Sequence, residues 1–271
     1  MGLRINTNVP ALNAGRILSR SSQALNQSLE RLSSGLRINR AADDAAGLAI
    51  AEGFQSVVRG TQQAQRNAQD GVSLVQTAEG SLSETTNILQ RIRELAVQAA
   101  NGTQSTNNRL AIDSEVSQLL SQIDDIATTT QFNGIAVLSS TQTITLQSGA
   151  MTSQTLVVAL TGAKTSDLGV STVHVSTLAT AVSAISTIDN AIKSVTTLRS
   201  TLGAYQNRLE FTINTLAIQE ENSSASESAI RDADIAKETI AFTRNQILVS
   251  AGTSVLAQAN LVPQTALTLL G

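Results

Sequence analysis

The sequence predicts a mainly α fold, in which long antiparallel helices from both chain ends form a coiled-coil-like rod with a small β-hairpin insertion in the middle. Three observations lead to this prediction. Apolar residues recur every seven positions in both halves of the chain, which is the repeat of helices that wind around one another. Only two of the 271 residues are proline, so little interrupts a helix. Aromatic residues make up 2% of the chain, so aliphatic side chains supply most of its apolar content.

The first predicted helix lies in residues 1–42. It begins near Pro10, because proline in the first turn of a helix removes no helical hydrogen bond. Leucines then follow alternating steps of four and three residues, which place them on one face of the helix. We expect this face to pair with residues 228–271. The candidate packing residues are Leu18, Leu25, Leu29, Leu32 and Leu36.

Residues 43–127 are predicted to form a helical hairpin. Its first helix repeats apolar residues every seven positions and stops at Asn101 and Gly102, because glycine readily adopts the left-handed conformation that follows helix ends. Its second helix has apolar steps of four and three. The candidate packing residues are Val75, Leu82, Leu89, Ile112, Val116, Leu119 and Ile123.

Residues 128–177 are rich in Thr, Ser, Val and Gly and are the only part that we predict to be β. Asn133 and Gly134 predict a turn near its start. The single histidine, His174, is expected to lie on a strand and to face solvent. Apolar residues alternate with others, as in strands, at Ile144, Leu146, Leu156, Val158, Leu160, Val173 and Val175.

The seven-residue repeat resumes in residues 178–227, which are predicted to form one long helix. A polar stretch at residues 222–227 separates it from a last helix in residues 228–271. Pro263 is expected to bend or loosen that last helix because it removes a backbone donor. The candidate packing residues of the two segments are Ile188, Val195, Leu202, Leu209 and Leu216, then Leu248, Val255, Val262 and Leu269.

Composition argues against several classes of protein. The chain has no cysteine, which excludes disulfides and thiolate chemistry. A net charge of −3 with scattered basic residues disfavours a nucleic-acid surface, and no apolar run is long enough to span a membrane. Neighbouring acids such as Asp124 and Asp125 point in different directions on a helix. We find no nucleotide, zinc or nucleophile motif, and so predict no enzyme, no cofactor and no metal.

The two end segments carry apolar faces that have few partners within one chain. Burying an aliphatic side chain contributes about 1.5–3 kcal/mol, whereas ordering one residue costs about 1–2 kcal/mol of backbone entropy. For two helices that pair only with each other, the free energy gained by burial is therefore close to the entropy cost of ordering them. We predict that about 40 residues at each end are disordered in the free subunit and fold when copies pack together.

Several motifs resemble those of bacterial flagellins. Residues 4–8 (RINTN), 32–39 (LSSGLRIN) and 41–47 (AADDAAG) look like the N-terminal signature of that family. Residues 90–102 (QRIRELAVQAANG) resemble its long helix and following turn, and residues 130–134 (TQFNG) resemble the start of its β-hairpin. Residues 251–260 (AGTSVLAQAN) are similar to its C-terminal motif. The resemblance covers most of the chain in order.

This resemblance implies a subunit of a helical homopolymer that serves swimming motility. It implies export of the unfolded chain through the flagellar type III apparatus, a chaperone on the C-terminal helix, and junction and cap proteins as further partners. Residues 1–42 and 228–271 would form an inner tube around a channel. Residues 43–127 and 178–227 would form an outer tube, with only the small β element of residues 128–177 outside it. The filament would be extracellular.

The resemblance also implies a contact with the Toll-like receptor that senses flagellins in animals. Gln90, Arg91 and Leu95 on the first long helix and Glu115 on the second match the receptor-contact motif of the family. We expect these residues to serve subunit contacts first, with receptor binding as an incidental property.

Three other interpretations compete with a filament subunit. A hook–filament junction protein has similar ends and is present in few copies. A cytoplasmic coiled-coil scaffold, or a rod like that of a chemoreceptor, would explain the heptads and leave the β insertion and the terminal motifs unexplained. An enzyme is the weakest alternative, because no catalytic constellation is present. No secretory signal peptide is visible at the N-terminus, so a secreted chain would use a route that does not read one.

Overall fold

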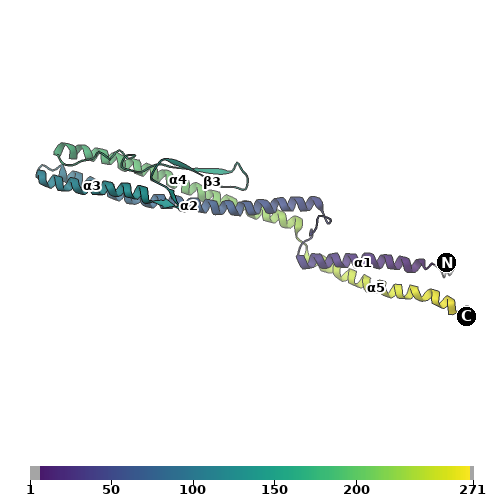
Figure 1. The fold of residues 1–271 in the computed structure, drawn as a ribbon. Helices are drawn as coiled ribbons and strands as arrows, with labels where there is room; N and C mark the ends of the chain where they lie inside the picture. The colour runs from purple at the N-terminus through teal and green to yellow at the C-terminus, as the bar shows by residue number, and fades with distance from the viewer. Residues whose placement is uncertain (1–6, 269–271) are drawn as a thin grey trace. The chain divides into compact units, whose positions relative to one another are not determined.

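The computed structural model describes residues 7–268, and side chains as far as residue 261. The chain divides into two compact units. One contains residues 1–56 and 222–271, and the other contains residues 57–221. The described part has five helices and four short strands, which confirms the predicted mainly α fold with a β insertion. Figure 1 shows these elements along the chain.

In the first unit, helix α1 (Val9–Ser34) packs antiparallel against helix α5 (Ile235–Thr268), as Figure 1 shows. We call this pair of helices the terminal arm. The Asn8 side chain caps α1 by accepting a hydrogen bond from the Ala11 N–H at 3.1 Å, and it donates to the Ala259 carbonyl at 2.8 Å. At the other end of the arm, the Arg31 guanidinium lies 3.8 Å from the Glu238 carboxylate.

The joint that follows α1 is built from backbone hydrogen bonds. Gly35 ends the helix in the left-handed conformation, with φ of 73°, which glycine adopts without steric cost. Its carbonyl accepts from the Ala233 N–H at 2.9 Å, and the Arg37 N–H donates to the Arg231 carbonyl at 2.7 Å. Residues 35–37 and 231–233 are therefore held side by side in a fixed register.

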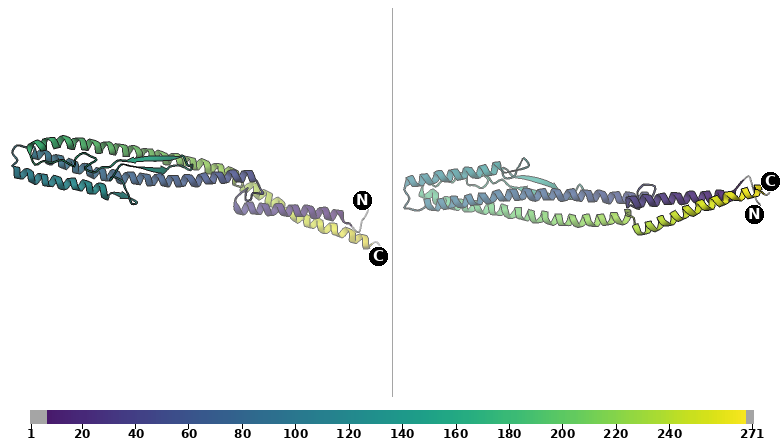
Figure 2. Two further views of the ribbon diagram at one scale, coloured as in Figure 1. Left: turned by 45° about the horizontal axis from the view of Figure 1, so that its top comes forward. Right: turned by 90° about the horizontal axis from the view of Figure 1, so that it is seen from below.

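The second unit contains most of helix α2 (Ala45–Ala99), helix α3 (Thr106–Thr129) and most of helix α4 (Leu178–Arg231). Both views of Figure 2 show α2, α3 and α4 side by side. Their seven-residue repeats meet in one apolar core with residues of the β segment. Ion pairs flank this core, including Arg93 with Asp189 at 2.6 Å and Arg199 with Glu79 at 3.1 Å.

Two antiparallel hairpins lie between α3 and α4. Strands β1 (Gln131–Phe132) and β2 (Ile135–Ala136) form the first, and β3 (Gln142–Gln147) and β4 (Thr155–Leu160) form the second. The second hairpin lies close to α2 at two glycines. A Cβ atom on Gly71 would collide with Leu146 Cδ1, and one on Gly60 would come within 2.8 Å of Ala150 Cβ. Glycine at both positions lets the hairpin approach the helix.

Residues 161–177 differ from the sequence-based prediction. Val173 and Val175 are buried as expected, yet they belong to an irregular segment with turns rather than to a strand. The Val173 N–H donates to the Val170 carbonyl in a turn, and the Val175 N–H donates to Asp113 Oδ1 at 2.6 Å instead of to a neighbouring strand. His174 is therefore not a strand residue. It is exposed, and its Nδ1 lies 3.5 Å from Asp113 Oδ2.

The boundary between the last two helices also differs from expectation. The polar stretch at residues 222–227 does not end α4, which continues to Arg231 before a short break at residues 232–234. Helix α5 continues past Pro263 to Thr268. Among the described residues, no helix combines the length and the hydrophobicity that a membrane span needs. No three acidic or histidine side chains among the described residues lie close enough together to hold a metal ion.

Candidate assembly surface

The inner side of the terminal arm is a narrow seam between α1 and α5. On α1, Leu18, Leu25 and Leu32 lie seven residues apart and are half-buried against α5. The one fully buried residue described in this helix is the polar Ser28. The seam thus excludes water only in part. A helix pair of this kind gains little stability from burial.

On α5 the seam runs through Phe242, Val249 and Leu256, which are half-buried and again seven apart. Gly252 lies on the same face, and a Cβ atom there would be 3.2 Å from Leu18 Cδ1, which places the two helices in close contact. None of the α5 side chains described, as far as residue 261, is fully buried.

The opposite face of α5 is also apolar. Ile240, Ile247 and Leu261 are 61%, 62% and 51% exposed. Ile247 is two residues before Val249, which turns it about 200° around the helix axis and away from α1. In a pair of helices this outer face meets water and is normally polar. A helix with apolar residues on opposite faces is normally buried on both, so the outer face of α5 lacks a partner.

Further exposed apolar side chains extend this surface over both helices of the arm. All of them are large aliphatic residues that keep between 47% and 68% of their surface in contact with solvent. They are Val9, Leu12, Ile17 and Leu29 of α1, and Ile235, Ile240, Ile247, Leu248, Val255 and Leu261 of α5. We call these residues the arm surface. Burying the remainder of each would contribute about 1 kcal/mol.

The structure separates the candidate packing residues of the chain ends into two groups. Leu18, Leu25, Leu32 and Leu36 are half-buried, whereas Leu29 is 47% exposed. Leu248 and Val255 lie one residue before the seam positions Val249 and Leu256, and they are 47% and 58% exposed. The side chain of Val262 is not described, and Leu269 lies outside the described residues.

The candidate packing residues of the second unit lie within its own core. Leu119 is half-buried, and the others are at most 8% exposed. These others are Val75, Leu82, Leu89, Ile112, Val116, Ile123, Ile188, Val195, Leu202, Leu209 and Leu216. The second unit therefore buries its heptad residues within one chain, whereas the terminal arm leaves several of its apolar residues exposed.

Carboxylates stabilise two turns next to the arm, at residues 39–43 and 234–237. The backbone N–H groups of Arg40 and Asn39 donate to Asp43 and lower the pKa of its carboxyl below the ordinary value. The N–H of Lys237, helped by its ammonium group, lowers the pKa of Asp234 in the same way at the start of α5. Both turns therefore favour ionised carboxylates.

The candidate receptor residues lie in the second unit. Arg91 is exposed and binds Glu115 at 2.9 Å and Glu94 at 3.2 Å. The hydrogen bond to Glu115, followed by that to Glu94, raises the pKa of Arg91. Gln90 is exposed beside it. Leu95 is 2% exposed and packs in the core, so it supports this surface from below and is covered in the isolated chain.

Sequence reasoning missed two anchoring residues of α3. Asp124 accepts hydrogen bonds from the Thr165 N–H and hydroxyl, both at 2.8 Å, and Asp113 accepts from the Val175 N–H. The two acids are 11 residues apart, which places them on one face of the helix. Only that spacing in the sequence could have indicated their role. It also missed the outer α5 line of Ile240, Ile247 and Leu261, whose spacing of seven and then fourteen residues was present in the sequence.

Comparisons with known proteins agree with this arrangement. The model of the bacterial flagellin N-terminal helical region matches residues 5–143, and that of the bacterial flagellin C-terminal helical region matches residues 185–270. A flagellar filament 31.3 kDa core protein of Treponema maltophilum is 44% identical over 283 residues, which cover 98% of this chain and 99% of the relative. A flagellin of Halalkalibacterium halodurans is 48% identical over 274 residues, with the same coverage.

A solved structure is similar over part of the chain. The crystal structure of Bacillus cereus flagellin has a TM-score of 0.50 and 34% sequence identity. The match covers 56% of this chain and 88% of that chain.

Proposed function

The chain belongs to the bacterial flagellin family, and we propose that its arm surface holds copies of the chain together in the filament. Flagellins are structural proteins, and this one is a subunit of the extracellular flagellar filament that serves motility. A hook–filament junction protein or a cytoplasmic scaffold is not favoured, because relatives that match nearly the whole chain are flagellins or filament core proteins.

A single observation supports the arm surface as the polymer contact: α5 is apolar on the face opposite α1. Ile240 and Ile247 expose more than half of their surface in the isolated chain. Contiguous exposed apolar residues mark interaction sites in soluble proteins. Copies of the same helices supply the matching apolar surface, and the contact repeats along a helical polymer because each subunit presents the same faces.

On this proposal the terminal arm belongs to the inner tube of the filament and the unit of residues 57–221 to the outer tube. The division follows from burial. The outer-tube unit has a core of its own, with Leu82, Leu89 and Ile188 at most 1% exposed, so it is stable before assembly. The arm has no such core, so it becomes stable when neighbouring copies cover it.

Asparagine substitutions on the arm surface test the proposal. Leu248→Asn and Val255→Asn keep the approximate size of the side chain and remove its apolar character. Because both residues are exposed in the isolated chain, the subunit should fold as before and fail to extend filament seeds. Gln246→Asn, at an exposed polar position of the same helix, is the matched control and should extend seeds normally. Growth of both test variants at the rate of the unchanged protein would contradict the proposal.

We further propose that the arm folds during assembly. The gain from its narrow seam is small compared with the backbone entropy of ordering two helices, about 1–2 kcal/mol per residue. Protease should therefore remove α1 and α5 from the free subunit, leave residues 57–221 intact, and spare both helices in filaments. Mass spectrometry of the fragments measures this. Protease-resistant ends in the free subunit would show that the arm is folded before assembly.

Export of the unfolded chain is part of the same proposal. The two apolar faces of α5 need cover before assembly, and a chaperone that binds this helix would supply that cover. Junction and cap proteins would meet the same surfaces at the two ends of the filament. If a chaperone binds α5, it should protect this segment from protease in the free subunit and should bind Leu248→Asn more weakly.

Receptor recognition is a second, subordinate proposal for the surface around Arg91. Gln90, Arg91 and Glu115 offer exposed polar groups there, with Leu95 supporting them from the core. Arg91→Ala should weaken filament assembly, receptor signalling, or both. Arg93→Ala is the matched control, since it removes an ion-paired arginine that binds Asp189 instead. Normal assembly and normal signalling by Arg91→Ala would refute this role.

A further inference from the structure

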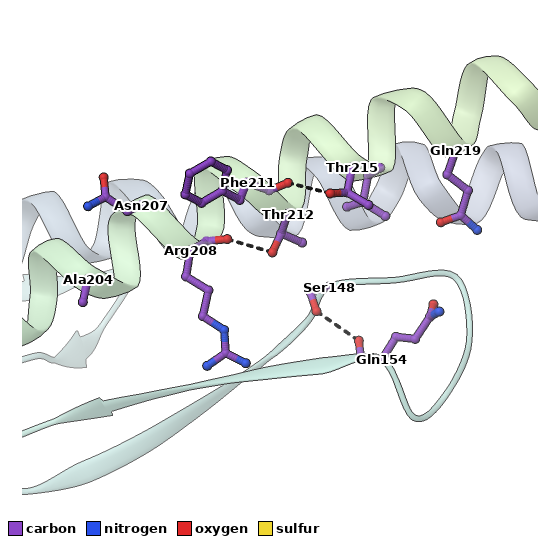
Figure 3. A pocket seen from close by; sticks show the side chains of 10 residues that line it. Ser148, Gln154, Ala204, Asn207, Arg208, Phe211, Thr212, Thr215 and Gln219 are labelled. Carbon is purple, nitrogen blue, oxygen red and sulfur yellow. Dashed lines mark hydrogen bonds between the residues drawn. The ribbon is translucent and has the colours of Figure 1, made fainter.

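A groove opens on the second unit between α4 and the loop that joins β3 to β4. Its volume is about 620 Å³. Figure 3 shows Arg208, Phe211 and Thr215 of α4 along one side, with Ser148 and Gln154 of the hairpin on the other. Phe211 is 71% exposed, more than any other large apolar residue described in the chain.

The hydroxyl groups along the groove are already used. Thr212 donates to the carbonyl of Arg208 at 2.8 Å, and Thr215 donates to that of Phe211 at 2.9 Å. Ser148 donates to the carbonyl of Gln154 at 3.2 Å. The hydroxyl hydrogens of Ser148, Thr212 and Thr215 are therefore satisfied within the chain. The lining also contains the polar side chains of Asn207 and Gln219.

Phe211 lies on the outer side of α4. It is two residues after the core residue Leu209, and Ile218, which is 61% exposed, is two residues after the core residue Leu216. Two residues correspond to about 200° around the helix, so Phe211 and Ile218 form an apolar line that the core of this chain does not cover. An uncovered line of large apolar residues indicates a contact with another molecule.

Arg208 adds a positive charge beside this apolar line. In the described part of the chain, no carboxylate lies within 4.0 Å of the Arg208 guanidinium, although Arg91, Arg93 and Arg199 each have a carboxylate partner. The partner should therefore supply a carboxylate next to an apolar side chain.

Helix α2 carries such a pair on its exposed face. Glu94 and Val97 are three residues apart, as are Arg208 and Phe211, and three residues span about 4.5 Å of helix. Val97 is 49% exposed, and the Glu94 side chain is 70% exposed. Arg91 is shared by Glu94 and Glu115, which leaves one negative charge in excess.

We propose that the groove receives the Glu94–Val97 face of α2 from a second copy of the chain. Arg208 pairs with the neighbour's Glu94, Phe211 packs on its Val97, and the two helices run parallel at this contact. The inference rests on the proposed function, because it requires that copies of the chain assemble. It adds a contact between outer-tube units to the contact made by the terminal arms.

A charge exchange tests the pairing. Arg208→Glu and Glu94→Arg should each raise the critical concentration for seeded growth about tenfold, which corresponds to 1.4 kcal/mol. The variant that carries both changes restores opposite charges across the contact and should grow at a lower critical concentration than either single variant. Lys193→Glu, on an exposed part of α4 outside the groove, controls for net charge. Phe211→Ser should raise the critical concentration at least as much as Arg208→Glu.

Thermal unfolding of the monomers shows whether any variant has lost its fold, and none should, because all these side chains are exposed. The pairing would be overturned if the effects of the two single changes on the critical concentration added up in the double variant. It would also be overturned if Arg208→Glu and Phe211→Ser grew like the unchanged protein. The proposed function fails separately. If Leu248→Asn blocks growth and the groove variants do not, the groove inference alone is wrong, and if Leu248→Asn grows normally, the arm contact is wrong.

Discussion

Asp124 and Asp125 are neighbours of the same type on α3, and the structure predicts very different consequences when each is replaced. Asp124 accepts two hydrogen bonds at 2.8 Å from Thr165, which is 6% exposed, and so fixes residues 161–177 on the helix. The Asp125 side chain is exposed and has no hydrogen bond among the described residues. The pair therefore offers a test in which only position differs.

Asp124→Ala leaves a buried N–H and a buried hydroxyl of Thr165 without their acceptor. A lost hydrogen bond to a charged group costs about 1.5–3 kcal/mol, so the loss of both bonds should lower the unfolding free energy by about 3–6 kcal/mol. For a unit of this size, 1 kcal/mol shifts the melting temperature by about 2–4 °C, which predicts a fall of about 6–24 °C. Asp125→Ala should change stability by less than about 0.5 kcal/mol.

Tyrosine fluorescence suits this measurement. Tyr205 is the only tyrosine, the chain has no tryptophan, and Tyr205 packs against the core of the unit that contains Thr165. Its emission therefore reports on the melting of residues 57–221 without interference from the arm. Asp124→Asn keeps one acceptor and should fall between the two alanine variants. Equal melting temperatures for Asp124→Ala and Asp125→Ala would refute the anchoring role.

Three further predictions concern packing and charge. Leu89→Ala removes a fully buried side chain and should cost about 2–5 kcal/mol in the same fluorescence assay; a loss below 1 kcal/mol would mean that the core relaxes around the cavity. Gly71→Ala places a Cβ atom against Leu146 Cδ1, so it should move the β3–β4 hairpin and speed hydrogen exchange in β3, whereas unchanged exchange would show that the Leu146 side chain rotates aside. The lowered pKa values of Asp43 and Asp234 stabilise their turns above the ordinary value of 3.8, and this stability disappears as pH falls through the lowered values. Carboxyl titration of assembled filaments by solid-state NMR should place both midpoints below 3.8, and a midpoint at or above 3.8 would contradict these hydrogen bonds.

Most of the helical architecture could be predicted from the sequence, because it depends on local spacing. Repeats such as Leu82 with Leu89 and Leu202 with Leu209 require one buried face along a helix. The β-rich composition of residues 128–177 indicated the hairpins. It did not reveal that Val173 lies in an irregular segment or that the side chain of Asp113 on α3 holds Val175, since alternation looks the same in a strand and in a buried irregular segment.

The sequence predicted that the chain ends carry an assembly surface, and it did not predict which residues face outward. The sequence showed apolar repeats at both ends with too few partners in one chain. On α5, however, apolar residues occupy several adjacent lines. One line contains Leu248 and Val255, and the next contains Val249 and Leu256. Neighbouring residues differ by about 100° around the helix, so spacing alone does not determine which line faces α1.

By itself, then, the sequence determined the helices, their approximate limits, the family and the need for self-assembly, because heptads and motifs are properties of consecutive residues. Only the tertiary structure decided that Val249 faces α1 while Ile247 faces outward, that Asp124 is an anchor while Asp125 is not, and that Phe211 borders a groove. Each of these depends on which surface of a helix meets another segment. That choice is made by the packing of parts of the chain that are far apart in sequence.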